Sequence, residues 1–153
     1  MVQIAPGRGL QGRLIYRTKE HSFDFESSSS FQCPARTSLQ FGTLQLEVAL
    51  PVGTALFIWG YHPQELWQEH AVPVPPARPG LLQIQDVGLR PGISVRKVDV
   101  GEWITTNDIR SGWLRFGDRT NNEVRYCEFG DDMVAAVSSD GNVRAFYLHP
   151  HYL

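Results

Sequence analysis

Two histidines separated by one residue, His149 and His151, are the side chains best spaced for metal chemistry. On an extended segment, residues two apart point to the same side. Two imidazoles there could ligate a transition metal together with a carboxylate such as Asp131 or Asp132. The alternative interpretation is a solvent-exposed tail. No further ligand stands at a defined spacing. A metal site at His149, His151 and Asp131 is therefore kept as an alternative hypothesis, behind a non-catalytic binding role.

A second group with binding chemistry is aromatic: Phe57, Trp59, Tyr61 and Trp67 follow one another closely. Trp59 and Tyr61 would share one face of a strand. An exposed platform built on Trp59, Tyr61 and Trp67 would anchor a partner protein or stack on a sugar ring. The structural alternative is that these rings cap the core where a sheet meets a helix.

Motifs of catalysis are missing from the chain. It contains no Gly-x-Ser-x-Gly, no His-Glu-x-x-His and no Gly-x-x-x-x-Gly-Lys, which would indicate a nucleophile elbow, a zinc protease or a P-loop. The segment Gly7-Arg8-Gly9 is interpreted as a flexible loop. The sequence therefore predicts no catalytic residue and no cofactor.

The two cysteines, Cys33 and Cys127, have no Cys-x-x-Cys neighbour that would indicate zinc or redox chemistry. In a cytosolic chain they are expected as free thiols. A bridge between them, the alternative, would close a loop of about 95 residues.

Charge argues against two classes of partner. The net charge is −2, and the halves are balanced, with 5 basic and 6 acidic groups in residues 1–76 and 9 and 10 in residues 77–153. No basic field is therefore expected to attract nucleic acid or anionic lipid. The sequence lacks a signal peptide and any apolar run of about 18 residues, so we expect a cytoplasmic protein without membrane insertion.

The fold prediction starts from the stretch Glu123 to His149, which reads as three strands, 123–129, 133–138 and 143–148. Asp140-Gly141 between the last two predicts a hairpin with a type I′ turn, in which both central residues have positive φ. Gly130-Asp131-Asp132 predicts another tight turn. Because these strands are apolar on both faces, we expect them in the centre of a sheet.

Short apolar or alternating runs predict strands upstream of this stretch, at 2–4, 13–18, 22–26, 43–50, 54–60, 81–85, 93–98, 103–106 and 112–116. Residues 63–70 predict one short helix. Four prolines within residues 71–80 predict an extended strap that cannot be a central strand. About ten to twelve strands at a spacing of about 8–12 residues indicate an antiparallel β-sandwich or barrel, and we expect one all-β domain over residues 1–153.

These observations favour a non-catalytic binding or assembly module that acts through a protein partner or through self-association into an oligomer. Strands that could add to a partner's sheet edge, and the arginine and aromatic content, support this hypothesis. The alternative, from another class, is a small β-barrel or sandwich enzyme or ligand-binder that uses the His149, His151 and Asp131 metal site.

Overall fold

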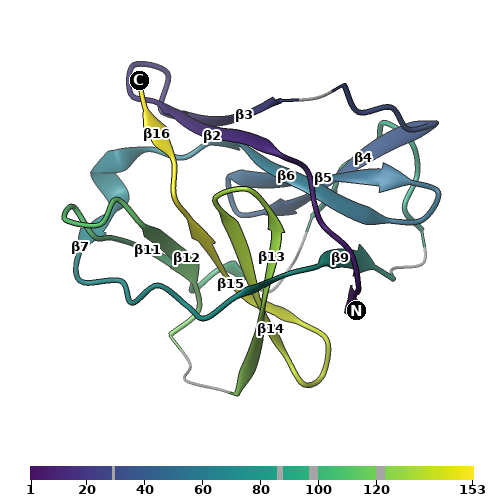
Figure 1. Ribbon diagram of the computed structural model, residues 1–153. Coiled ribbons are helices and arrows are strands. Elements are labelled where there is room, and N and C mark those ends of the chain that lie inside the picture. Colours follow the sequence, from purple (N-terminus) through teal and green to yellow (C-terminus); the bar gives the residue numbers. More distant parts are fainter. Residues whose placement is uncertain (29, 86–87, 97–99, 120–122) are drawn as a thin grey trace.

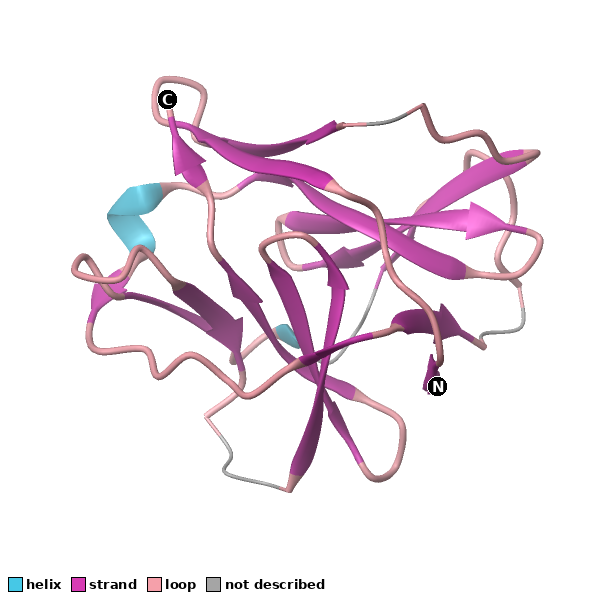
Figure 2. Ribbon diagram, in the orientation of Figure 1, coloured by secondary structure: helices cyan, strands magenta, loops and turns pink. Residues whose placement is uncertain are grey.

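The computed structural model consists of two β-sheets that share one core (Figure 1). It describes residues 1–28, 30–85, 88–96, 100–119 and 123–153. Strands dominate these residues, and loops join them (Figure 2). The all-β sandwich prediction is therefore confirmed, whereas the alternative of a closed barrel is not: the sheets do not close on themselves.

The first sheet contains nine strands. They are β1 (Val2–Ala5), β2 (Gly12–Arg17), β3 (Ser22–Ser27), β4 (Ala35–Phe41), β5 (Leu44–Leu50), β6 (Thr54–Tyr61), β9 (Leu81–Ile84), β10 (Val95–Arg96) and β16 (His151–Tyr152). Their order is β10-β4-β5-β6-β3-β2-β16, and β9 joins β6 to β1. Of the strand predicted over 93–98, positions 97 and 98 lie outside the described residues.

The second sheet contains seven strands. They are β7 (Gln68–Glu69), β8 (Arg78–Pro79), β11 (Ile104–Asn107), β12 (Leu114–Gly117), β13 (Val124–Gly130), β14 (Met133–Ser138) and β15 (Val143–Leu148). Their order is β7-β11-β12-β15-β14-β13-β8, which places the predicted meander, β13 to β15, inside the sheet.

The edges of the sheets correct the prediction of purely antiparallel pairing. Each end of both sheet orders is a two-residue strand that pairs parallel with its neighbour: β10 with β4, β16 with β2, β7 with β11 and β8 with β13. These pieces are not hairpin partners. They are stretches of loop that run beside an edge strand in the same direction, so adjacency in sequence does not set their orientation.

One of the two predicted turns has a different geometry. Asp132 has a φ of +66° and reverses the chain between β13 and β14. In the next turn Gly141 has a positive φ (+80°) but Asp140 does not, so the type I′ prediction is wrong. Gly141 N–H donates to the Ser138 carbonyl at 3.0 Å, and Ser138 N–H to that of Asn142 at 2.9 Å. This is a longer loop, of the kind that places one glycine in the left-handed region.

The proline strap covers the outer face of the second sheet. It leads from β7 at one edge to β8 at the other (Figure 1). Val72 and Ala77 of the strap pack on Val134 and Tyr147, which point away from the main core. The prolines need no ladder partner there, because the strap contributes side chains and not a central strand. Strands from both sides of the strap occur in both sheets.

The helix predicted over 63–70 is a single 3-10 turn, Gln64–Leu66. Trp67 is already extended, with φ −79° and ψ 143°, and its ring packs on the core 4.8 Å from the ring of Tyr16. The next residues pair with β11 as β7. Burial of the indole and this pairing replace the second helical turn.

Both cysteines are free thiols, as predicted. Burial raises the pKa of the Cys127 thiol to about 11, with Arg125 opposing the shift. Such a thiol remains protonated and unreactive near neutral pH. In the described part of the chain, no helix has the length and apolar character needed to span a bilayer.

Candidate functional site

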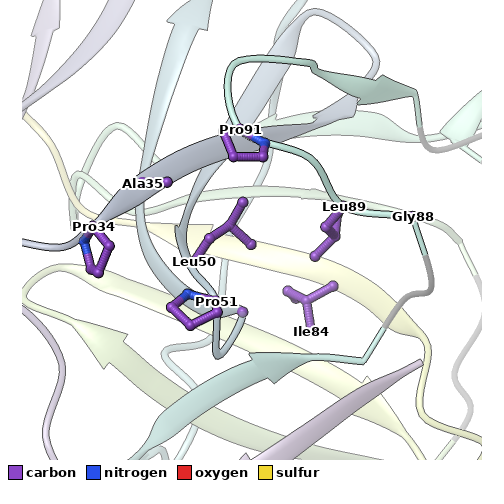
Figure 3. Close-up of a pocket in the computed structure, with 9 residues that line it drawn as sticks. Pro34, Ala35, Leu50, Pro51, Ile84, Gly88, Leu89 and Pro91 are labelled. Carbon is purple, nitrogen blue, oxygen red and sulfur yellow. The ribbon is translucent and has the colours of Figure 1, made fainter.

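A concavity of about 610 Å³ lies at the end of the first sheet, where β5 turns into β6 (Figure 3). The start of β4, the end of β9 and the loop 88–93 complete its wall. In Figure 3, Leu50 lies among the rings of Pro34, Pro51 and Pro91. The lining residues that the structure describes carry no polar side chain; they are Pro34, Ala35, Leu50, Pro51, Gly53, Ile84, Gly88, Leu89 and Pro91.

The β5–β6 turn holds Pro51 against the end of β9. Gly53 has a φ of +89°, and a Cβ at this position would lie 2.5 Å from the Ile84 carbonyl oxygen. Only glycine allows this approach. Gly53 N–H donates to the Ala49 carbonyl and Ile84 N–H to the Gly53 carbonyl, both at 2.8 Å. The turn is therefore fixed on two strands.

The loop 88–93 forms the opposite wall and is attached to β4. Gly92 N–H donates to the Arg36 carbonyl at 2.9 Å. Thr37 Oγ1 donates to the Ile93 carbonyl at 2.6 Å. These bonds hold the apolar side chains of the loop over the concavity.

A second concavity, of about 410 Å³, shares Pro34, Leu50 and Pro51 with the first. We call the two together the apolar groove. Val52, of which 66% is exposed, lies on its surface. The remaining lining of the second concavity is Arg8, Gly9, Leu10, Phe31, Gln32, Cys33, Ala49, Thr54, Ala55, Leu56 and Leu81.

The apolar groove offers little for catalysis. Among its described lining residues, Arg8 and Cys33 are the ionisable ones. The Cys33 thiol donates to the Ala35 carbonyl at 3.3 Å, and the described lining holds no histidine or carboxylate that could activate it. The described side chains are suited to burying the apolar surface of a ligand.

The histidines of the metal hypothesis approach a different carboxylate from the one named for the site. His149 Nδ1 lies 3.6 Å and His151 Nε2 3.7 Å from the Asp132 oxygens. Asp131 instead accepts the Gly12 N–H at 3.0 Å. His149 Nε2 faces the Ser111 carbonyl at 3.1 Å. Over the described ranges, no three His, Cys, Asp or Glu side chains are grouped so as to hold a metal ion.

The predicted aromatic residues occupy three different surroundings. Trp67 belongs to the core cluster described above. Tyr61 is 53% exposed, and its ring meets that of His21 edge-on at 6.2 Å. Trp59 is half-buried next to Gln45, its partner on β5. Burial raises the pKa of nearby Glu47, a shift that Trp59 and Arg36 oppose. In the described contacts these three rings do not form one platform.

His62 was not singled out from the sequence as a site. It lies just beyond β6, is 8% exposed and bridges the two sheets. Its Nε2 is 2.6 Å from Thr105 Oγ1 and its Nδ1 3.1 Å from Thr43 Oγ1. Burial lowers the pKa of His62 to about 4. A neutral ring that bonds two hydroxyls is a structural clip rather than a catalytic base.

Gly7, Gly9 and Gly12 match Gly-x-Gly-x-x-Gly, a pattern that the interpretation as a flexible loop passed over. A dinucleotide site requires the pattern to open a helix after a strand. Here the chain passes from β1 to β2 without a helix. A Cβ on Gly9 would overlap the Phe129 carbonyl, so glycine serves close packing of this loop on β13.

No protein-family model matches the chain, and the curated proteins contain no match to it. The groove residues carried no sequence motif. The signal that could have found them is the position of Pro34 and Pro51 at the paired ends of β4 and β5, where Ala35 faces Leu50.

Proposed function

We propose that this chain is a non-catalytic binding module whose apolar groove docks an apolar segment of another protein. The observation that supports the proposal is the lining of the larger concavity, whose nine described residues carry no polar side chain. A largely apolar concavity of several hundred Å³ is typical of a binding site.

The groove is well suited to binding because it is preformed. Proline fixes φ. The turn carrying Pro51 and the loop carrying Pro91 are attached to strands by the hydrogen bonds described above, and Pro34 directly precedes β4. A rigid surface loses little conformational entropy when a partner docks. Each 100 Å² or so of apolar surface removed from water contributes about 2.5 kcal/mol before the entropic costs of association are subtracted.

Docking through side chains is favoured over strand addition. The sheet orders end in β7, β8, β10 and β16, each two residues long, and the side branch of the first sheet ends in β1, which has four residues. Such short edges offer a partner strand few backbone groups, and short or proline-bearing edges are how proteins discourage edge pairing. A partner would therefore recognise the groove by filling it.

The experiment is a selection of random short peptides displayed on phage against the purified chain. Selected peptides are synthesised with a fluorescent label, and binding is followed by anisotropy. Pro34→Glu and Val52→Glu each place a charge in the groove. Their matched controls are Pro76→Glu and Val74→Glu, at exposed strap positions outside the groove. Circular dichroism verifies that all four variants are folded.

We expect apolar peptides to be selected, and expect the groove variants to weaken their binding at least tenfold while the strap variants leave it unchanged. Failure to select any peptide, or equal effects of groove and strap variants, would overturn the proposal. Sedimentation velocity of the chain alone tests self-association. A dimer broken by Val52→Glu but not by Val74→Glu would show that the groove receives a second copy instead.

A further inference from the structure

The apolar groove continues into a polar concavity of about 520 Å³, and Arg8 lines both. Its other lining residues are Gln11, Gly12, Arg13, Glu26, Ser27, Ser28 and Asp131. The surface thus changes along its length from apolar side chains to hydrogen-bonding and charged ones, with a guanidinium at the junction.

Both carboxylates of the polar concavity already have partners. Glu26 is 3.5 Å from the guanidinium of Arg13 and 3.8 Å from that of Arg17. Asp131 accepts the backbone N–H of Gly12 at 3.0 Å. Arg8 is placed differently: with the Gln11 amide oxygen turned towards it, that oxygen accepts from Nε at 3.2 Å and from Nη2 at 3.1 Å. Its partner there is a neutral amide.

The backbone fixes where Arg8 stands. The tight packing of Gly9 on β13 anchors the loop on one side of the arginine. Leu10 continues the anchoring by a bridge to Gly130, and Asp131 N–H donates to the Leu10 carbonyl at 3.1 Å. Ser28 Oγ donates to the Gln11 carbonyl at 3.0 Å. Arg8 therefore lies at the end of the groove, on a loop that hydrogen bonds and close packing fix to β13 and to Ser28.

We infer that the docked segment carries an acidic side chain next to its apolar residues, and that Arg8 binds this carboxylate. The inference rests on the proposed function of the groove. A guanidinium has a planar fork of donors that matches a carboxylate. A carboxylate would take the place of the neutral Gln11 amide as the acceptor, while the apolar side chains of the same segment fill the space beside Pro34 and Pro51.

The test is a double-mutant cycle on one of the selected peptides. Its acidic residue is changed from Glu to Gln, and the chain carries Arg8→Gln, Arg8→Lys or, as a control, Arg78→Gln on the edge strand β8. We expect acidic residues to be enriched among selected peptides. Arg8→Gln should weaken the Glu peptide about fivefold, as the loss of a rim ion pair would, and leave the Gln peptide unchanged. Arg8→Lys should recover part of the loss, and Arg78→Gln should have no effect.

The two proposals fail in different ways. Selected peptides without acidic residues, or equal effects of Arg8→Gln on the Glu and Gln peptides, would overturn the role of Arg8 even if the groove variants still weaken binding at least tenfold. Insensitivity to Pro34→Glu would overturn the groove itself, whatever Arg8 does.

Discussion

The apolar side chains at the two ends of β6 differ in whether they are enclosed or open to solvent. Just beyond the end at Tyr61, the rings of Phe23, Trp67 and Phe116 enclose His62 at centroid distances of 5.0 to 6.3 Å from it or from one another. Just before the other end, at Thr54, the side chains are equally apolar but form the open groove. Apolar side chains thus fill the space at one end of β6 and leave a concavity at the other.

The difference shows which end serves folding. At the closed end both nitrogens of the His62 ring have partners, and aromatic rings fill the space around it. At the open end rigid turns hold apolar side chains apart without filling the space between them. Surface that could collapse but is kept open by its backbone is available for a ligand, and the following predictions test that distinction.

The largest effect is expected from truncation at the closed end. Tyr16 is fully buried, packs on Trp67 and Phe23, and donates from its hydroxyl to the His62 carbonyl at 2.7 Å. Tyr16→Ala should lower the free energy of unfolding by about 3–5 kcal/mol. Urea denaturation measures it, and Val52→Ala at the open end is the control. Similar losses for both variants would remove the contrast between the two ends.

Acid should weaken the closed end through His62. Its folded pKa of about 4 lies below 6.5, the ordinary pKa of a histidine in an unfolded chain, so the folded state binds fewer protons between these two pH values. The stability is complete above pH 6.5 and falls as pH decreases towards 4, by about 3 kcal/mol in all. Urea titrations at several pH values should show a shallower dependence for His62→Gln. An unchanged dependence would exclude His62 as the origin.

The two threonines that bond the His62 ring should differ in how much their loss lowers the free energy of unfolding. Thr105 is 6% exposed, so Thr105→Val leaves a buried imidazole nitrogen without a partner and should cost about 1–3 kcal/mol. Thr43 is exposed, and water can replace its hydroxyl, so Thr43→Val should cost less than about 1 kcal/mol. Thermal denaturation of the two variants side by side tests this, and equal costs would contradict it.

The sequence was informative where a pattern is local. Alternation in Leu44, Leu46 and Val48 correctly predicted β5, and those side chains lie in the core. The proline spacing correctly predicted an extended strap. The turn at Asp140 shows where local patterns fail to predict geometry. Asp-Gly permits a type I′ turn, but only Gly141 of the pair has a positive φ, and Ser138 bonds to Asn142 across a longer loop.

The features that the sequence could not supply depend on residues far apart in the chain. His62 meets Thr105 from a separation of 43 residues. Pro34 and Pro91 reach one concavity from different loops, and the short parallel edges depend on where loops return. The metal hypothesis placed His149 and His151 near a carboxylate, but that carboxylate is Asp132, whereas Asp131 accepts the Gly12 N–H. Whether these residues bind any ligand stays a prediction.

The smallest effect on stability is expected in the groove. Val52 is 66% exposed, so Val52→Glu removes almost no buried contact and should change the free energy of unfolding by less than about 0.5 kcal/mol. Urea denaturation beside Val74→Glu, a strap position with 55% exposure, gives the comparison. A loss above about 1 kcal/mol would mean that Val52 supports the core. Without such a loss, an effect of Val52→Glu on peptide binding can be assigned to the groove surface and not to unfolding.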